Sequence, residues 1–132
     1  MKTYAIATAL VEYEKTYLIA KRSLKKQFSP SQWEFISGFV EEKESAEETI
    51  LRELEEETNL KGEVIKSAKP FVIIDEEARW IVIPYLIKVN SDKVTINSSD
   101  HIEYIWATRT ELNSYSDIKD FISKFKEVNL LS

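Results

Sequence analysis

This 132-residue sequence contains no cysteine, only two glycines, three prolines and a single histidine. Without cysteine the chain can form no disulfide, no catalytic thiol and no thiolate zinc site. The two glycines, Gly38 and Gly62, are too few for the glycine-rich loop of a P-loop or Rossmann nucleotide site. No apolar run approaches the roughly 20 residues that a membrane-spanning helix needs. Any bound phosphate would therefore be held by a metal ion and by Lys or Arg side chains.

The overall composition is that of an ordinary water-soluble protein, with 43% hydrophobic and 31% charged residues. A chain of this length is expected to form one domain over residues 1–132. An isoelectric point near 5.0 argues against broad nucleic-acid binding, so we expect no stable nucleic-acid partner. The stretch from Met1 to Tyr4 leads into a strand-like segment without a signal-peptide pattern. Together with the lack of cysteine, this predicts a cytoplasmic location.

Acidic residues gather in one segment, from Gly38 to Leu60. Nine glutamates lie in this segment, and the rest of the chain has 14 acidic and 16 basic residues. Ser45 followed three residues later by Glu48 forms the pattern of a capping box and predicts the start of a helix. No Gly or Pro interrupts the run through Thr58, and the following residue is an Asn, which suits a left-handed C-cap.

Helical geometry separates the glutamates of this segment by the direction in which they face. At about 100° per residue, Glu57 lies about 20° from the axis of the apolar stripe centred on Ile50. Glu53 lies about 60° and Glu56 about 120° from that axis. A charge run is usually a solvated face, but carboxylates beside an apolar stripe are costly unless they are paired or bound to metal. A divalent cation such as Mg²⁺ would relieve this cost and the repulsion between neighbouring carboxylates.

The same segment resembles the Nudix box, which reads Gly, five residues, Glu, seven residues, then Arg-Glu-apolar-x-Glu-Glu-x-Gly-apolar. The chain matches this box at eight positions: Gly38, Glu44, Arg52, Glu53, Leu54, Glu56, Glu57 and Leu60. Asn59 stands at the second Gly, and because Asn tolerates positive φ we expect the helix end to be preserved. The preceding residues 33–38, Trp-Glu-Phe-Ile-Ser-Gly, are similar to the W-E-F-P-G-G of the MutT branch, with Ile-Ser in place of Pro-Gly.

The resemblance implies a role for each matching residue. Glu53, Glu56, Glu57 and the carbonyl of Ser37 would bind Mg²⁺, with Mn²⁺ as a substitute. Glu53 or Glu56 would also polarise the attacking water, Arg52 would orient the carboxylates, and Glu44 would support the loop. The alternative, a salt-bridged surface helix without catalytic function, is disfavoured because so many positions match in register.

Family members often add a carboxylate five or six residues before a Trp that closes the last strand. Trp106 is that residue here, so Asp100 is the first choice for a further metal ligand or base, and Glu103 is the second. A simple turn residue is the alternative interpretation of Asp100. His101 is the only histidine, and we expect it to have a structural role.

Basic and aromatic side chains outside the box are candidates for substrate binding. Arg22, with Lys21, Lys25 or Lys26, would clamp phosphate, because a guanidinium matches two phosphate oxygens. A solvated basic turn is the competing interpretation. Phe35 and Gly38 are expected substrate contacts within the motif. One or two of the following aromatic residues would stack on a base, the others being core: Phe28, Trp33, Phe35, Phe71 and Trp80. Asn97 is a candidate for reading a base edge.

Hydrophobic patterns elsewhere predict the remaining elements. The expected strands cover residues 4–11, 16–22, 33–36, 63–75, 79–89 and 101–107, with a short strand at 94–96. Pro84 predicts an edge or a bulge in its strand. A helical turn is expected at 110–112, and Ser116 is expected to cap a final helix. This order predicts an α+β fold with a mixed sheet between helices, and the Nudix resemblance implies the same α/β/α sandwich.

The predicted function is that of a Mg²⁺-dependent Nudix hydrolase that converts a nucleoside triphosphate or related nucleotide to the monophosphate and pyrophosphate. Dinucleoside polyphosphates and ADP-ribose stay open as substrates, because the box does not specify the loops that choose them. An inactive nucleotide-binding module is the alternative from another class. RNA cap hydrolysis would require a basic groove, for which the sequence shows no strong positive balance. The expected partner is a small nucleotide, and the protein is expected to be a monomer or a homodimer.

Overall fold

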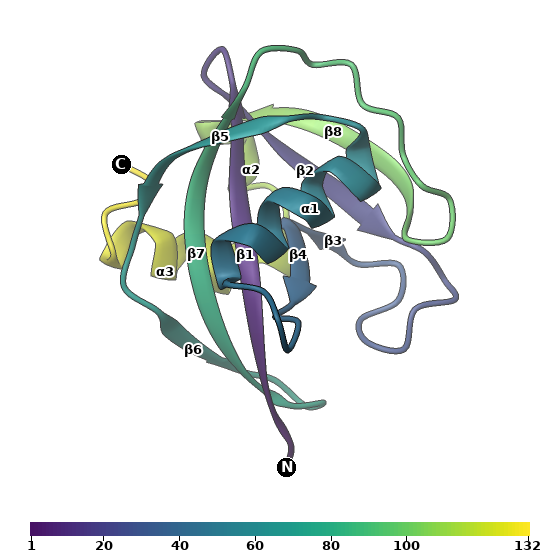
Figure 1. The fold of residues 1–132 in the computed structure, drawn as a ribbon, viewed down its shortest axis with the longest axis vertical. Coiled ribbons are helices and arrows are strands. Elements are labelled where there is room, and N and C mark those ends of the chain that lie inside the picture. Colours follow the sequence, from purple (N-terminus) through teal and green to yellow (C-terminus); the bar gives the residue numbers. More distant parts are fainter.

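The computed structural model describes all 132 residues, Met1 to Ser132, as eight strands and three α-helices (Figure 1). The strands are β1 (Thr3–Tyr13), β2 (Thr16–Arg22), β3 (Trp33–Glu34), β4 (Ile36–Phe39), β5 (Gly62–Ser67), β6 (Phe71–Ile74), β7 (Arg79–Val89) and β8 (His101–Thr108). The helices are α1 (Ala46–Thr58), α2 (Arg109–Leu112) and α3 (Lys119–Glu127), and a 3₁₀ turn, η1, covers Ser116–Ile118. No helix has the length and apolar character required to cross a membrane.

All eight strands belong to one sheet, and its mixed character agrees with the prediction from the sequence. Its main path runs β3-β2-β1-β7-β5, with β4 paired to β1, β6 to β7 and β8 to β2. The long central strands β1 and β7 are parallel, and the other pairs are antiparallel. The chain between β1 and β7 includes α1, which crosses one face of the sheet (Figure 1).

Strand β1 divides the core into two layers because its side chains alternate between the faces of the sheet. Leu10 packs in the cluster that contains Phe125 of α3, whereas Ala9 packs in the cluster that contains Leu54 of α1. Both faces are covered, which explains why residues 6–11 form an almost continuous apolar run. The predicted sandwich of a sheet between helices is therefore confirmed.

Helix α1 begins and ends at the predicted residues. The Ser45 hydroxyl accepts a hydrogen bond from the Glu48 amide, and the Glu48 carboxylate accepts one from the Ser45 amide. At the other end Asn59 has φ = 62° and ψ = 22°, a left-handed C-cap whose N–H bonds the Glu55 carbonyl. Asparagine thus performs the backbone role of the second glycine in the box.

The predicted edge or bulge at Pro84 is wrong, because β7 lies between β1 and the pair β5–β6 and the nearby register irregularity lies in β5, between Val64 and Lys66. Pro84 instead faces the break between two partner strands, since β5 ends at Ser67 and β6 begins at Phe71. The Pro84 carbonyl accepts a hydrogen bond from the amide of Ala68, within that break. A proline is tolerated in the central strand because its missing N–H points where the neighbouring ladder is interrupted.

Two further expectations are corrected. Residues 94–96 form no strand; instead Thr95 donates its N–H to the carbonyl of Thr58, and Asn97 donates to that of Glu57. The segment satisfies carbonyls that the last turn of α1 leaves free. Ser116 does not cap the final helix, because it begins the 3₁₀ turn, and α3 starts at Lys119 without a side-chain cap.

Candidate active site

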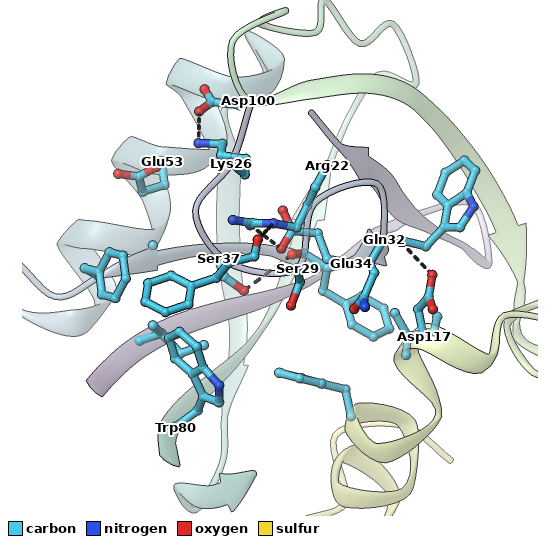
Figure 2. A pocket seen from close by; sticks show the side chains of 18 of the residues that line it. Arg22, Lys26, Ser29, Gln32, Glu34, Ser37, Glu53, Trp80, Asp100 and Asp117 are labelled. Carbon is cyan, nitrogen blue, oxygen red and sulfur yellow. Dashed lines mark hydrogen bonds and ion pairs between the residues drawn. The ribbon is translucent and has the colours of Figure 1, made fainter. Parts of the chain in front are cut away.

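A pocket of about 530 Å³ opens beside β4 and the inner flank of α1 (Figure 2). Its acidic wall includes the three glutamates Glu53, Glu56 and Glu57 of α1. The loop between β2 and β3 and the start of α3 supply other parts of the lining. This volume lies within the range of pockets that bind small molecules.

The three glutamates differ in exposure as their helical angles predict. The side chain of Glu57 is 7% exposed, that of Glu53 is 23% exposed and that of Glu56 is 54% exposed. Glu57 lies at the bottom of the pocket, and Glu56 lies at its rim. The apolar stripe of α1, centred on the fully buried Ile50, fixes this order by turning the helix toward the sheet.

Arg52 connects Glu44 with two of these glutamates. Its Nε and Nη2 donate to the two carboxylate oxygens of Glu44, both at 2.9 Å, and its Nη1 donates to Glu53 at 3.1 Å and Glu56 at 3.0 Å. The hydrogen bonds from Arg52 hold the pKa of Glu44 below its usual value. Arg52 and Glu44 do not line the pocket, so they can orient the carboxylates without contacting a ligand.

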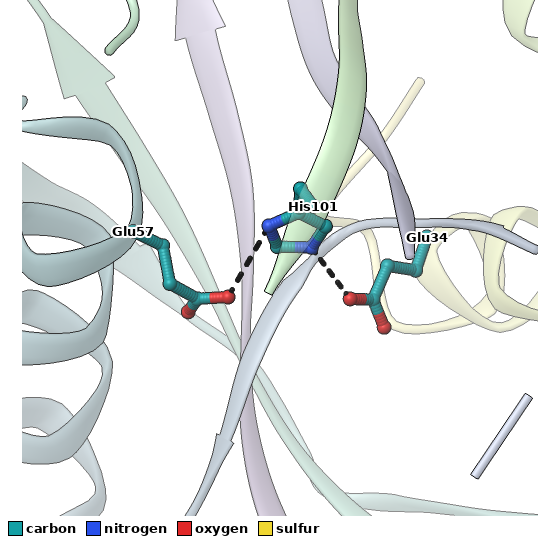
Figure 3. Close-up of side chains that lie close together, drawn as sticks. All are labelled: Glu34, Glu57 and His101. Carbon is teal, nitrogen blue, oxygen red and sulfur yellow. Dashed lines mark hydrogen bonds and ion pairs between the residues drawn. The ribbon is translucent and has the colours of Figure 1, made fainter. Parts of the chain in front are cut away.

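Glu57 faces His101 of β8, and Glu34 of β3 lies on the other side of the imidazole (Figure 3). The three carry ligand-type atoms within 4.8 Å of one another, and they are the only such group of three His, Asp or Glu residues. Two buried atoms, Glu57 Oε2 and His101 Nδ1, have no hydrogen-bond partner. Burial, followed by the charges of Glu34 and Glu53, raises the pKa of Glu57 to about 10.

The sequence predicted no role for Glu34 and a structural role for His101. The signal for Glu34 was its place in the Trp-Glu-Phe motif, where a charged residue stands between two large aromatic residues. Nothing in the sequence indicated that β3 and β8 bring Glu34 and His101 together, because β8 pairs with β2 at a long sequence separation.

Two of the four candidate phosphate-binding cations line the pocket. Arg22 bonds the carbonyl of Phe28 through Nε and the carboxylate of Glu34 through Nη1, both at 2.8 Å. Lys26 also lines the pocket, whereas Lys21 and Lys25 do not. One cation of β2 and one of the loop that follows it therefore line the pocket, and the other two do not.

The two candidates for an added carboxylate are also separated. Asp100 lines the pocket and accepts a hydrogen bond from Lys26 Nζ (Figure 2). The two atoms are 2.5 Å apart. Glu103 lies outside the pocket, opposite Lys21 in the β2–β8 ladder. Ser37 lines the pocket at β4, and its hydroxyl is 2.9 Å from that of Thr8.

The match to a protein family covers almost the whole chain. The model of the NUDIX domain matches residues 1–126. This chain belongs to the Nudix family. The segment that carries α1, with its carboxylates and Arg52, is therefore its Nudix box.

Curated relatives of this Nudix protein carry several activities in their names. A nucleoside triphosphatase NudI from Klebsiella pneumoniae (strain 342) is 29% identical over 128 residues, covering 87% of this chain and 89% of the relative. An RNA pyrophosphohydrolase from Shewanella denitrificans is 28% identical over 99 residues, or 60% of this chain. That alignment spans 56% of the relative, and an alignment to a mouse ADP-sugar pyrophosphatase spans 25% of the relative.

Solved structures show the same fold. A MutT protein from Methanosarcina mazei Go1 is 25% identical and superposes with a TM-score of 0.84, covering 97% of this chain and 96% of its own. The Escherichia coli ORF135 protein superposes with a TM-score of 0.72 at 21% identity, over 98% and 92% of the two chains.

The aromatic candidates divide between the pocket and the core. Phe28, Trp33, Phe35 and Trp80 line the pocket. Phe71 does not, because it packs against Phe121 and Phe125. Asn97 lies outside as well, and its side-chain oxygen accepts from the hydroxyl of Ser99.

The residues of the Nudix pocket suit a hard divalent cation. Such ions prefer carboxylate oxygens and keep several waters. The carboxylates of Glu53 and Glu57 offer such oxygens, and Glu57 Oε2 is buried without a hydrogen-bond partner. A buried polar atom of this kind calls for a partner, and a cation would supply it.

Proposed function

We propose that this chain is a Mg²⁺-dependent Nudix hydrolase that cleaves a phosphoanhydride bond of a nucleoside triphosphate, releasing the monophosphate and pyrophosphate. The observation that supports this proposal is the composition of the pocket. It combines carboxylates of the Nudix helix, the cations Arg22 and Lys26, and aromatic rings in one cavity. Metal, phosphate and base would thus be bound side by side.

In this proposal Glu53, Glu56 and Glu57 hold Mg²⁺ or Mn²⁺, with the Ser37 carbonyl and Asp100 as further ligands. The bound ion would polarise a phosphoryl oxygen and lower the pKa of the attacking water. Glu53 and Glu56 are bonded to Arg52. One of these two would orient and deprotonate the water.

The chain's own cations would bind the phosphates. Arg22 is held by the carbonyl of Phe28 and by Glu34, so its guanidinium is positioned before a ligand arrives. Such preorganisation lowers the entropy lost on binding. Lys26 would supply a second positive charge from the same loop. Phosphoryl transfer depends mostly on such positioning and charge neutralisation.

The opposite side of the pocket would receive the base. Phe28 and Trp80 pack edge to face with ring centroids 5.0 Å apart, and both line the cavity. Their faces and edges offer a stacking surface that any base can use. Dinucleoside polyphosphates and ADP-ribose contain the same linked diphosphate, so they stay as alternative substrates within the class.

A nucleotide panel with Mg²⁺ tests the proposal. Nucleoside triphosphates, a dinucleoside polyphosphate and ADP-ribose are incubated with the protein, and phosphate, pyrophosphate and monophosphate are quantified. We expect equal amounts of monophosphate and pyrophosphate from a triphosphate. Glu57→Gln should lose activity, whereas the matched variant Glu55→Gln, on the exposed side of α1, should keep it.

Two results would contradict the proposal. One is the absence of turnover for every compound with a linked diphosphate. The other is full activity in Glu57→Gln. Tight nucleotide binding in calorimetry, without turnover under any divalent metal, would instead identify an inactive binding module. We further propose a cytoplasmic location, where nucleotides are made, and a monomer or homodimer, which sedimentation would distinguish.

A further inference from the structure

A line of four side chains runs along the wall of the pocket, from the partly exposed Arg22 and Glu34 to the buried His101 and Glu57. Arg22 Nη1 bonds Glu34 Oε1 at 2.8 Å, and Glu34 Oε2 lies 2.8 Å from His101 Nε2. On its other edge, His101 Nδ1 lies 3.6 Å from Glu57 Oε1 (Figure 3). The four residues come from β2, β3, β8 and α1. They connect a candidate phosphate-binding cation to the most buried of the candidate metal ligands.

The hydrogen bond to Glu34 fixes the orientation of the imidazole. Because a carboxylate that is paired with the guanidinium of Arg22 can only accept hydrogen bonds, we assign the proton of His101 to Nε2. The ring is 1% exposed and packed on all sides. Nδ1 is consequently held toward Glu57.

Glu57 has no other basic neighbour. His101 is the one Lys, Arg or His side chain within 4.0 Å of its carboxylate, whereas Glu53 and Glu56 share Arg52. The separation of 3.6 Å is too long for a hydrogen bond. The imidazole therefore restricts the Glu57 carboxylate by steric contact, and prevents it from moving away from the pocket.

We infer that His101 is a positioning residue for Glu57, anchored through Glu34 to Arg22. This inference rests on the proposed function, because it assigns the imidazole a role in metal binding beyond filling space. Residues that contact the metal-ligating side chains, rather than the ion itself, typically change metal affinity by about 10–100-fold when they are mutated. Glu34 contributes to this positioning because it orients the imidazole, although it is not itself a proposed metal ligand.

Direct measurement of Mn²⁺ binding without nucleotide tests the inference, by paramagnetic resonance of free Mn²⁺ or by calorimetry. His101→Leu fills the space but has no polar edge, and its Kd should rise by about 10–100-fold. His101→Gln, whose amide can reach Glu34, should lose less. Excess Mn²⁺ should restore the kcat of His101→Leu, a rescue that a general loss of folding does not show.

Two controls separate positioning from stability and from charge. Val89→Ala shortens a buried side chain at the far end of β7, and it should bind Mn²⁺ like wild type. Glu34→Gln and Asp120→Asn each remove one negative charge from the pocket lining. Glu34→Gln should weaken Mn²⁺ binding more than Asp120→Asn, because only Glu34 contacts His101.

The outcomes distinguish this inference from the proposed function. If the wild-type protein binds no divalent metal, both the inference about His101 and the proposed function are wrong. If wild type binds Mn²⁺ and a folded His101→Leu binds it with the same Kd, the inference alone is overturned. Equal effects of Glu34→Gln and Asp120→Asn would also overturn it, since charge would then explain the loss.

Discussion

The side chain of Glu53 lies directly against the backbone of Gly38, where no other residue type would leave it room. A Cβ on Gly38 would lie 2.4 Å from Glu53 Cγ and 2.8 Å from Cδ. No glycine in the structure has positive φ, so the first glycine of the Nudix box is required by this close approach rather than by its backbone conformation. The contact sets where Glu53 meets the pocket.

Gly38→Ala should therefore displace Glu53 and reduce hydrolysis. A shift of about 1 Å in a catalytic group can reduce the rate by about 100-fold, and we expect a loss of this order in kcat with a weaker Mg²⁺ affinity. Steady-state kinetics at several Mg²⁺ concentrations provides the measurement. Gly62→Ala is the matched control, because a Cβ there would meet the ends of the Ile87 and Leu54 side chains. It should reduce stability and leave kcat unchanged; equal kcat in Gly38→Ala and wild type would contradict the prediction.

The end of the same helix gives a prediction about stability. Asn59 has φ = 62°, a conformation that costs an ordinary residue about 1–2 kcal/mol. Asn59→Ala should thus lower the free energy of unfolding by about 1 kcal/mol, and Asn59→Gly should change it little. Urea denaturation of the three proteins measures the difference. A destabilisation by Gly as large as that by Ala would show that the Asn side chain, rather than the backbone, matters here.

Much of the fold followed from local patterns in the sequence. The capping box at Ser45, the left-handed cap at Asn59 and the apolar stripe through Ile50 are set by neighbours in the chain, so the ends and the buried face of α1 could be predicted. The position of Pro84 could not, because it depends on where β5 and β6 stop beside β7. Such breaks are decided by strand pairing at long sequence separation.

Some residues of the candidate site could likewise be predicted from local sequence, and others could not. Glu53, Glu56 and Glu57 are placed by one helix, and their order of exposure follows from its angles. Glu34 and His101 meet only because β3 and β8 lie on opposite sides of β2. The spacing of residues along the sequence does not predict this contact, so Glu34 and His101 could be identified as neighbours only from the structure.

Asp100 and Glu103 are expected to differ sharply when each is replaced by its amide. Asp100 lines the pocket and is bonded to Lys26, whereas Glu103 lies outside the pocket, beside Lys21. Asp100→Asn should reduce kcat, and the loss should shrink as Mg²⁺ is raised if Asp100 is a ligand. Glu103→Gln should leave kcat near that of wild type. A larger loss in Glu103→Gln than in Asp100→Asn would reverse the assignment.

The raised pKa of Glu57 predicts a pH-dependent stability of the metal-free protein. The pKa in the folded state is about 10 against an ordinary value of 4.5, so above pH 4.5 the unfolded chain releases a proton that the folded chain keeps. The contribution of this carboxyl group to the free energy of unfolding is therefore fully present below pH 4.5. It decreases as pH rises toward 10, by at most about 1.4 kcal/mol per pH unit.

Urea denaturation in the presence of a chelator, between pH 6 and pH 9, measures that slope. Glu57→Gln has no proton to release and should show a flatter dependence, and Glu55→Gln, on the exposed face, should retain the wild-type slope. Because a metal ion binds the ionised carboxylate, Mg²⁺ should raise the melting temperature of wild type more at pH 9 than at pH 6. Parallel pH profiles for wild type and Glu57→Gln would show that burial does not hold a proton on this carboxylate.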